Sequence, residues 1–248
     1  MNKIIDIKDL KFSYDNKKNI FSHLNIEVFK WDFIGIFWSN GTWKTTLVKL
    51  ILSILKPSFW KISWFDDKWN NISQDKINIE YISQKAQLID SIVPITVKEI
   101  VKMWNKVKWW LLSTFKESCS YETIEKALNH VNMKDFINTL FSDLSGWQKQ
   151  RVLIAKALIS NPDIIIMDEP TAWVDLIAQK HFYDLLSHLN EVHNITIILI
   201  SHDTKFIGDK IKRLWYVWKN SCNECRDDEI HLLNIKKMFT KQQVEFLN

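Results

Sequence analysis

The residues best suited to chemistry lie at positions 38–46, Trp-Ser-Asn-Gly-Thr-Trp-Lys-Thr-Thr. A phosphate-binding loop (P-loop) has the pattern Gly, four residues, Gly, Lys, then Ser or Thr. Trp38 and Trp43 occupy the two glycine positions, and Lys44 and Thr45 follow. In such a loop backbone N–H groups surround the phosphates, the lysine neutralises their charge and the hydroxyl binds Mg²⁺. The pattern therefore indicates a nucleotide site in which tryptophan stands where glycine belongs.

A second group of reactive residues ends the apolar run at 164–167. Asp168 and Glu169 follow this run directly. A strand in a parallel sheet delivers its last residues to the carboxyl edge, where such folds bind ligands. We expect Asp168 to support Mg²⁺ and Glu169 to act as general base toward the attacking water. Two acids at a strand end are by themselves more often helix caps or solvated loop residues, and it is the P-loop that favours the catalytic interpretation.

The elements that would position these residues follow from hydrophobic periodicity. A buried strand is predicted before the P-loop, at 33–37, and a helix after it, from Leu47 to Leu55. Residues 86–143 differ, because they carry helical periodicity joined by polar loops. The alternation of strands and helices predicts an α/β protein with a mostly parallel sheet. Further strands are expected at 4–14, 20–29, 62–65, 77–83, 163–167 and 196–200, and further helices at 97–103, 121–131, 134–140, 148–160 and 177–192.

The composition is that of a globular protein. The 248 residues are 46% hydrophobic and 25% charged, and the net charge of +4 is too small to argue for nucleic acid. The sequence has neither a stretch long enough to cross a bilayer nor the apolar core of a signal peptide. Three cysteines, an odd number, fit a reducing compartment, so we expect a cytosolic protein. Cys222 and Cys225 have the spacing of zinc ligands without a second pair, which favours two free thiols.

Glycine is scarce and tryptophan abundant. The chain has 4 glycines and 13 tryptophans. Average usage of about 7% predicts roughly 17 glycines, which equals the sum of the glycines and tryptophans in this chain. We hypothesise that most of these tryptophans are misread glycines, since some bacterial lineages read UGA as glycine and a common alternative code reads it as tryptophan. The alternative is a protein truly rich in tryptophan, in which side chains at 38, 43 and 147 should be crowded.

Several ordered motifs resemble the ATPase subunits of ABC transporters. The segment Leu144-Ser145-Gly146-Trp147-Gln148 is similar to the Leu-Ser-Gly-Gly-Gln signature of that family. The resemblance reaches to about residue 218, and the remaining matches are Gln84 in the Q-loop, Asp175 in the D-loop, the switch histidine His202 and Tyr14, placed like the aromatic residue that stacks on adenine. Trp38, Trp43 and Trp147 fall on family glycines, Trp173 sits where many relatives have glycine, and Trp31, Trp60 and Trp69 lie at turns where glycine would suit.

The resemblance implies a P-loop NTPase (RecA-like) core with an antiparallel β subdomain and a helical subdomain at about 86–155. The ATPase domain would span 1–218, and 219–248 would be a short appendage. ATP and Mg²⁺ are the implied cofactors, with Thr45, Gln84 and Asp168 toward Mg²⁺ and Glu169, His202 and Gln84 as catalytic residues. The implied nucleotide-binding residues are Tyr14, Trp38, Ser39, Asn40, Gly41, Thr42, Trp43, Lys44, Thr45 and Thr46.

The implied partners are a second copy, a membrane permease and an extracytoplasmic binding protein, with no nucleic acid. The two copies would face head to tail, with Ser145, Gly146, Trp147 and Gln148 binding ATP in trans and Asp175 coupling the sites, at the cytoplasmic face of the membrane. Residues 93–101 and 168–175 are similar to importers of zinc, manganese and iron. Three alternatives remain: an importer of another substrate, a non-hydrolysing subunit with literal tryptophans, and a soluble ABC ATPase acting on ribosomes or DNA.

Overall fold

The chain divides into two compact units, Met1–Ile77 with Leu186–Asn248, and Asn78–Leu185. The structure is a computed structural model. It describes residues 2–14, 20–38, 43–56, 62–84, 86, 94–103, 120–170, 176–201, 211, 213–218 and 221–225, and only the backbone of 38, 43, 176, 177, 216–218 and 221–225.

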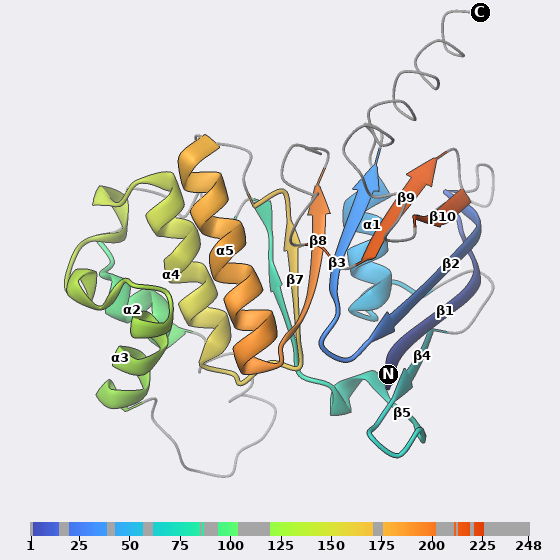
Figure 1. Cartoon of the computed structure of the whole chain (residues 1–248), viewed down its shortest axis with the longest axis horizontal. Helices are drawn as coiled ribbons and strands as arrows, with labels where there is room; N and C mark the ends of the chain where they lie inside the picture. The colour runs from blue at the N-terminus through green and yellow to red at the C-terminus, as the bar shows by residue number, and fades with distance from the viewer. Residues whose placement is uncertain are drawn as a thin grey trace, which may run out of the picture. The chain divides into compact units, whose positions relative to one another are not determined.

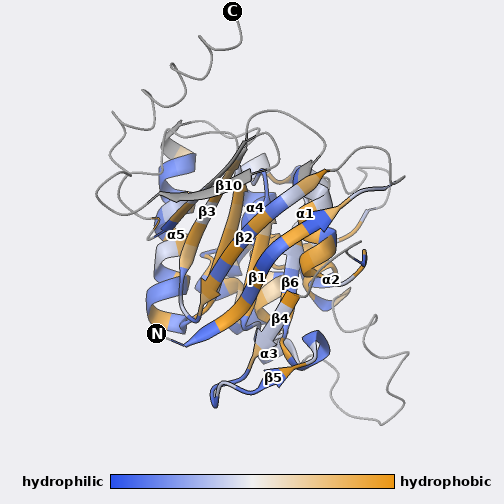
Figure 2. Cartoon of the chain, turned by 90° about the vertical axis from the view of Figure 1, so that its right-hand side faces the viewer, coloured by the Kyte–Doolittle hydropathy of each residue, from blue (hydrophilic) through white to orange (hydrophobic). Residues whose placement is uncertain are grey.

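One edge of the first unit is antiparallel. Strand β1 (Lys3–Phe12) pairs with β2 (Phe21–Phe29) and β4 (Ile62–Phe65), and β4 pairs with β5 (Asn71–Ile72), all antiparallel. A 3₁₀ turn, η1 (Gln74–Lys76), follows. Apolar and polar stretches alternate along β1 and β2 in Figure 2, and the apolar side chains are buried. The strands predicted at 4–14, 20–29 and 62–65 are confirmed.

The rest of the first unit is built around β3 (Phe33–Trp38), which pairs in parallel with β8 (Thr196–Ser201) and β9 (Arg213–Trp218) (Figure 1). Strand β10 (Ser221–Cys225) pairs antiparallel with β9 and parallel with β2, so the strand order is β5-β4-β1-β2-β10-β9-β3-β8. Phe33, Ile34, Ile36 and Phe37 of β3 are all buried. This continuous apolar run is typical of a strand covered on both faces.

Helix α1 (Trp43–Ile51) begins and ends earlier in the chain than the sequence predicts. The predicted helix to Leu55 is wrong beyond residue 51, because a Schellman motif ends α1. Ser53 has a positive φ of 56°. Its N–H donates to the Leu50 carbonyl at 3.0 Å, and the Ile54 N–H donates to the Lys49 carbonyl at 2.8 Å. These two bonds satisfy carbonyls at the helix end, and the apolar residues beyond them lie in the turn.

The second unit joins two parallel strands to a group of helices. Strand β6 (Ile79–Ile82) pairs in parallel with β7 (Ile164–Asp168). Helices α2 (Val97–Lys102) and α3 (Tyr121–His130) both contact α4 (Gly146–Leu158) (Figure 1). Helix α5 (Leu176–His193) begins in this unit and ends in the first. The predicted α/β class, with parallel strands, an antiparallel edge and an inserted group of helices, is confirmed.

The helix predicted at 134–140 is wrong. The structure has 3₁₀ turns there, η5 (Lys134–Phe136) and η6 (Phe141–Asp143). The carbonyls of Ile137 and Thr139 accept hydrogen bonds from the N–H groups of Lys98 and Val97, at 3.0 and 2.9 Å. The first N–H groups of a helix have no partner within it, so this segment caps α2 instead of forming a helix of its own.

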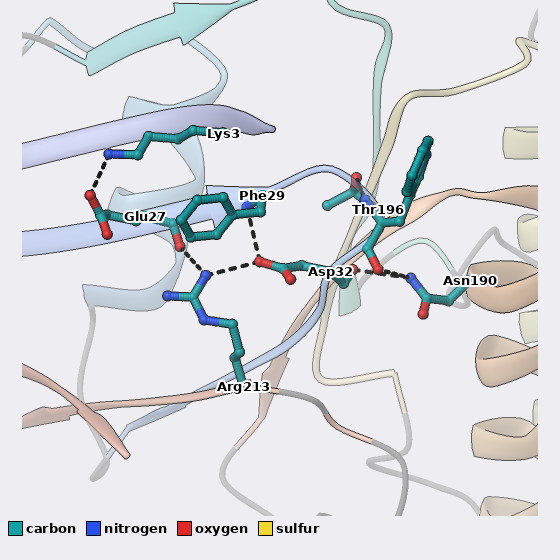
Figure 3. A network of polar contacts seen from close by, with 8 residues as sticks. Lys3, Glu27, Phe29, Asp32, Asn190, Thr196 and Arg213 are labelled. Atoms are coloured by element: carbon teal, nitrogen blue, oxygen red, sulfur yellow. Dashed lines mark hydrogen bonds and ion pairs between the residues drawn. The ribbon is translucent and has the colours of Figure 1, made fainter. Parts of the chain in front are cut away.

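A polar network holds the turn between β2 and β3 (Figure 3). The Asp32 carboxylate is buried, accepts the Phe29 N–H at 2.9 Å and pairs with Arg213 Nη1 at 2.9 Å. The Asn190 amide donates to the carbonyls of Trp31 and Asp32, at 2.9 and 3.2 Å, and Thr196 Oγ1 accepts the Trp31 N–H at 3.0 Å. Residues of α5, β8 and β9 therefore fix the start of the strand that leads to the P-loop.

Two tryptophans lie in left-handed backbone conformations. Trp31 has φ 64° and Trp69 has φ 62°. Four other described residues with positive φ are Asn or Asp, which tolerate this region, whereas a bulky side chain there is an outlier. Both tryptophan side chains are more than half exposed, so little packing offsets the strain. The backbone at these two turns suits glycine, as the hypothesis of misread codons expects.

We predict that Trp31→Gly and Trp69→Gly each raise the free energy of unfolding by about 0.5–1 kcal/mol. Relief of left-handed strain, about 1–2 kcal/mol, exceeds the entropy that glycine adds to the unfolded chain, about 0.4–1 kcal/mol. Urea denaturation measures the change. Trp147→Gly is the control, because Trp147 lies in α4, where glycine costs about 0.5–1 kcal/mol. A loss of stability in both turn variants would contradict the prediction.

We also predict that Asp32→Asn lowers the free energy of unfolding by about 3 kcal/mol, because it leaves the Arg213 charge without its buried partner. The Asp32 side chain is 5% exposed. The control is Glu122→Gln, which breaks an ion pair with Lys126 whose acid is 74% exposed and should cost less than about 0.5 kcal/mol. Urea denaturation measures both changes. Equal losses of unfolding free energy would show that the pair at Asp32 contributes no more stability than the exposed pair.

Candidate functional site

One group of candidate residues lies between β3 and α1. The structure confirms the predicted buried strand and shows a helix after the P-loop, whose residues Ser39, Asn40, Gly41 and Thr42 lie outside the described part of the chain. The N–H groups at the start of α1 carry partial positive charge and face the loop end of the helix, which suits an anion. In this first turn Lys44 is half-buried, Thr45 is exposed and Thr46 is buried.

Tyr14 lies beside this first turn of α1. Its hydroxyl is 3.0 Å from Oγ1 of Thr46, and its ring meets the Phe12 ring edge-on at 5.0 Å. The residue is nevertheless 61% exposed. An exposed aromatic face held next to a helix N-terminus can stack on a flat ring while the helix binds attached phosphates. The predicted stacking of Tyr14 on adenine stays a prediction, and the exposed ring beside α1 is compatible with it.

A separate group of candidate residues, in the second unit, lies at the carboxyl ends of β6 and β7. Asp168 is the last residue of β7, Glu169 follows it, and both are buried. The register pairs Ile82 with Met167, so Gln84, two residues beyond β6, leaves the same edge and is exposed. Gln84 therefore follows one strand, and Asp168 and Glu169 lie at the same edge of the strand beside it.

Glu169 has a left-handed backbone, with φ 49°. This conformation costs about 1–2 kcal/mol for a residue with a side chain, and such strain clusters at functional sites. The turn redirects the chain immediately after β7.

Tyr81 is a site residue that no sequence motif indicated. Its hydroxyl donates to Oδ2 of Asp168 at 3.3 Å. Burial, followed by the charge of Asp168, raises the pKa of the Tyr81 phenol well above its ordinary value, so the hydroxyl keeps its proton at neutral pH. Residues two apart on one strand share a face, so Ile166 and Asp168 do. Only the register of β6 against β7, which pairs Tyr81 with Ile166, shows that Tyr81 lies on that face.

The signature segment begins α4. Ser145 is the N-cap, its Oγ accepts the Gln148 N–H at 3.4 Å, and Gln148 Oε1 accepts the Ser145 N–H at 2.9 Å. Trp147 is half-exposed, with the Arg151 guanidinium 4.5 Å from its ring centre. The crowding expected at 147 is therefore not found, because the first turn of a helix directs this side chain outward. The side chains of Trp38 and Trp43, where crowding was also expected, are not among those described.

Several predicted residues lie outside the described part of the chain. These include Trp173 and Asp175 of the D-loop, the switch histidine His202 and the turn residue Trp60. Within the described residues no helix is long and apolar enough to cross a membrane, and no group of three or more His, Cys, Asp or Glu could hold a metal ion.

The predicted magnesium ligands are all oxygen donors. Asp168 offers a buried carboxylate, Gln84 an exposed amide oxygen and Thr45 an exposed hydroxyl. Mg²⁺ prefers hard oxygen ligands, and typically takes one or two from protein and the rest from phosphates and water. The donor set fits this ion.

Comparisons with known proteins agree on one family. The family model described as ABC transporter matches residues 21–172. The zinc uptake system ATP-binding protein ZurA of Listeria innocua is 38% identical over 203 residues, 82% of this chain and 78% of the relative. The high-affinity zinc uptake system ATP-binding protein ZnuC of Bacillus subtilis is 34% identical over 235 residues, 89% of this chain and 98% of the relative.

A solved structure shows the same fold. It is an ATP-binding cassette of an ABC transporter in its ADP conformation, superposes with a TM-score of 0.81 and is 20% identical. The superposition covers 98% of this chain and 99% of that one.

We predict that Ser145→Ala lowers the free energy of unfolding by about 1 kcal/mol, because it removes the N-cap of α4. Thr96→Ala is the matched control, since Thr96 forms the same capping box with Glu99 at the start of α2. Both variants should lose similar stability in urea denaturation. Ser142→Ala, which removes only an exposed bond to Asp143, should lose less. Full stability of the Ser145 variant would contradict the cap.

Proposed function

Because this chain belongs to the ABC transporter family of ATP-binding proteins, we propose that it is the ATP-hydrolysing subunit that energises import of a divalent metal ion. The observation that supports a metal ion as the cargo is the similarity, over most of both chains, to two subunits named for zinc uptake. Zinc, manganese and iron are the candidate cargoes. The residues that would hydrolyse ATP are present in the sequence: Lys44, Asp168, Glu169 and His202.

The nucleotide would bind at the start of α1. The Tyr14 ring would stack on adenine, and the P-loop residues Trp38 to Thr46 would surround the phosphates with backbone N–H groups. Lys44 would neutralise the β- and γ-phosphates. Support comes from the exposed Tyr14 ring beside the first turn of α1.

Residues that follow β6 and β7 would catalyse hydrolysis. Glu169 would accept a proton from the attacking water, with Gln84 and His202 completing the catalytic set. Its position directly after the buried strand β7 supports this role. Thr45, Gln84 and Asp168 would hold Mg²⁺, which when bound neutralises phosphate charge.

A second copy would complete the site. In a head-to-tail dimer the signature residues Ser145, Gly146, Trp147 and Gln148 would contact the γ-phosphate held by the other copy. The capped N-terminus of α4 supports this, because helix N-termini bind anions. Asp175 would link the two sites across the dimer.

Transport would be carried out by separate chains. A multi-spanning permease would dock near Gln84 and the helices of 86–155, and an extracytoplasmic binding protein would deliver the substrate. The subunit would then sit peripherally at the cytoplasmic face of the membrane. We propose 1–218 as the ATPase domain and 219–248 as an appendage, with β10 joining the sheet just beyond that boundary.

A second candidate is a subunit that does not hydrolyse ATP, which requires the tryptophans to be literal. The outward placement of Trp147 favours it, because α4 accommodates indole at that position. The left-handed backbone at Trp31 and Trp69 favours glycine instead. Peptide mass spectrometry of the native protein distinguishes the two: tryptophan at position 43 would refute misread codons.

We predict that Glu169→Gln lowers ATP turnover by a factor of about 10²–10⁴ and leaves ATP affinity nearly unchanged, since general-base catalysis contributes about this much. Lys44→Ala should abolish ATP binding itself. Both are tested in the chain as printed and in the chain with glycine at 38, 43 and 147. The control is Glu122→Gln, at an exposed position of α3. Equal turnover in the Glu169 variant would refute the assigned base.

A further inference from the structure

We propose that Tyr81 is a positioning residue for ATP hydrolysis, whose hydroxyl orients the Asp168 carboxylate toward the Mg²⁺ that arrives with the nucleotide. This inference rests on the proposed function, because that function makes Asp168 a magnesium ligand. Tyr81 itself would touch neither nucleotide nor metal.

The register of β6 and β7 places the two side chains together. Tyr81 is paired with Ile166, and the strands run parallel. Neighbouring partners point to the same face of a sheet, and so do residues two apart on one strand. Tyr81 and Asp168 therefore lie diagonally on one face, a separation that an aromatic side chain can span. The observed distance of 3.3 Å between Tyr81 Oη and Asp168 Oδ2 fits this geometry.

The surroundings of Asp168 make an oriented donor useful. The residue is only 7% exposed, and a carboxylate removed from water needs hydrogen-bond donors. A phenol offers one proton on a rigid ring, whereas the carboxylate has about four acceptor positions. The bond from Tyr81 uses one of these positions and thus restrains the carboxylate.

Tyr81 is also close in the chain to a second predicted magnesium ligand. Gln84 follows it by three residues and lies two residues beyond the end of β6. Hydrogen-bonded partners of metal-ligating carboxylates typically contribute about 10–100-fold to metal affinity or activity.

The test is Tyr81→Phe, which removes only the hydroxyl, in the form of the full chain that binds ATP. The probe is AMP-PNP, an ATP analogue that is not hydrolysed, titrated by calorimetry with and without Mg²⁺. We expect the gain in affinity that Mg²⁺ provides to fall about tenfold, with affinity in the absence of Mg²⁺ changed less than about twofold. Tyr121→Phe, the same change on an exposed tyrosine of the same unit, should match the unsubstituted protein.

A double-mutant cycle makes the assignment specific. In an Asp168→Asn background, Tyr81→Phe should reduce the Mg²⁺-dependent gain no further, because the hydroxyl acts only through this carboxylate. An unchanged Mg²⁺ dependence in Tyr81→Phe would overturn the proposal. So would an equal loss of affinity with and without Mg²⁺ together with a lower Tm, since that is the result of a purely structural role. Failure of the unsubstituted protein to bind AMP-PNP would refute the proposed function instead.

Discussion

The ion pair between the buried Asp32 and Arg213 anchors the strand that leads to the P-loop. A carboxylate with so little exposure is stable only with close partners, and it receives both the guanidinium and a backbone N–H. The pair closes the turn before β3 and joins it to β9. Since β3 has only six residues, fixing its start and its two parallel neighbours also fixes where the P-loop begins.

The candidate residues of the second unit are positioned by different contacts. Parallel pairing of β6 with β7 brings Gln84, Asp168 and Glu169 to one edge, and the hydrogen bond from Tyr81 restrains the central carboxylate. The signature segment instead depends on a capping box, which starts α4 at Gly146. In each case rigid elements end where chemistry is expected to begin, so that loops carry reactive groups on a fixed frame.

Trp31 and Trp69 differ from Trp147 in backbone conformation. At Trp31 and Trp69 the chain must turn left-handed, which every side chain larger than hydrogen opposes. At Trp147 the backbone is helical, so the side chain projects outward and stacks on Arg151. The hypothesis of misread glycines therefore has conformational support at the two turns, and support from the family motif alone at the signature.

The order of motifs and the hydrophobic periods by themselves determined the family, the α/β class and the strand ends that carry Asp168 and Glu169, because these depend on local pattern. The end of α1 is also a local matter, because its Schellman motif joins only residues 49–54. Tertiary structure alone decided two matters. The carbonyls of 137 and 139 were drawn into capping α2. Tyr81 met Asp168 only through strand register, a contact between residues 87 apart in the chain that no local pattern encodes.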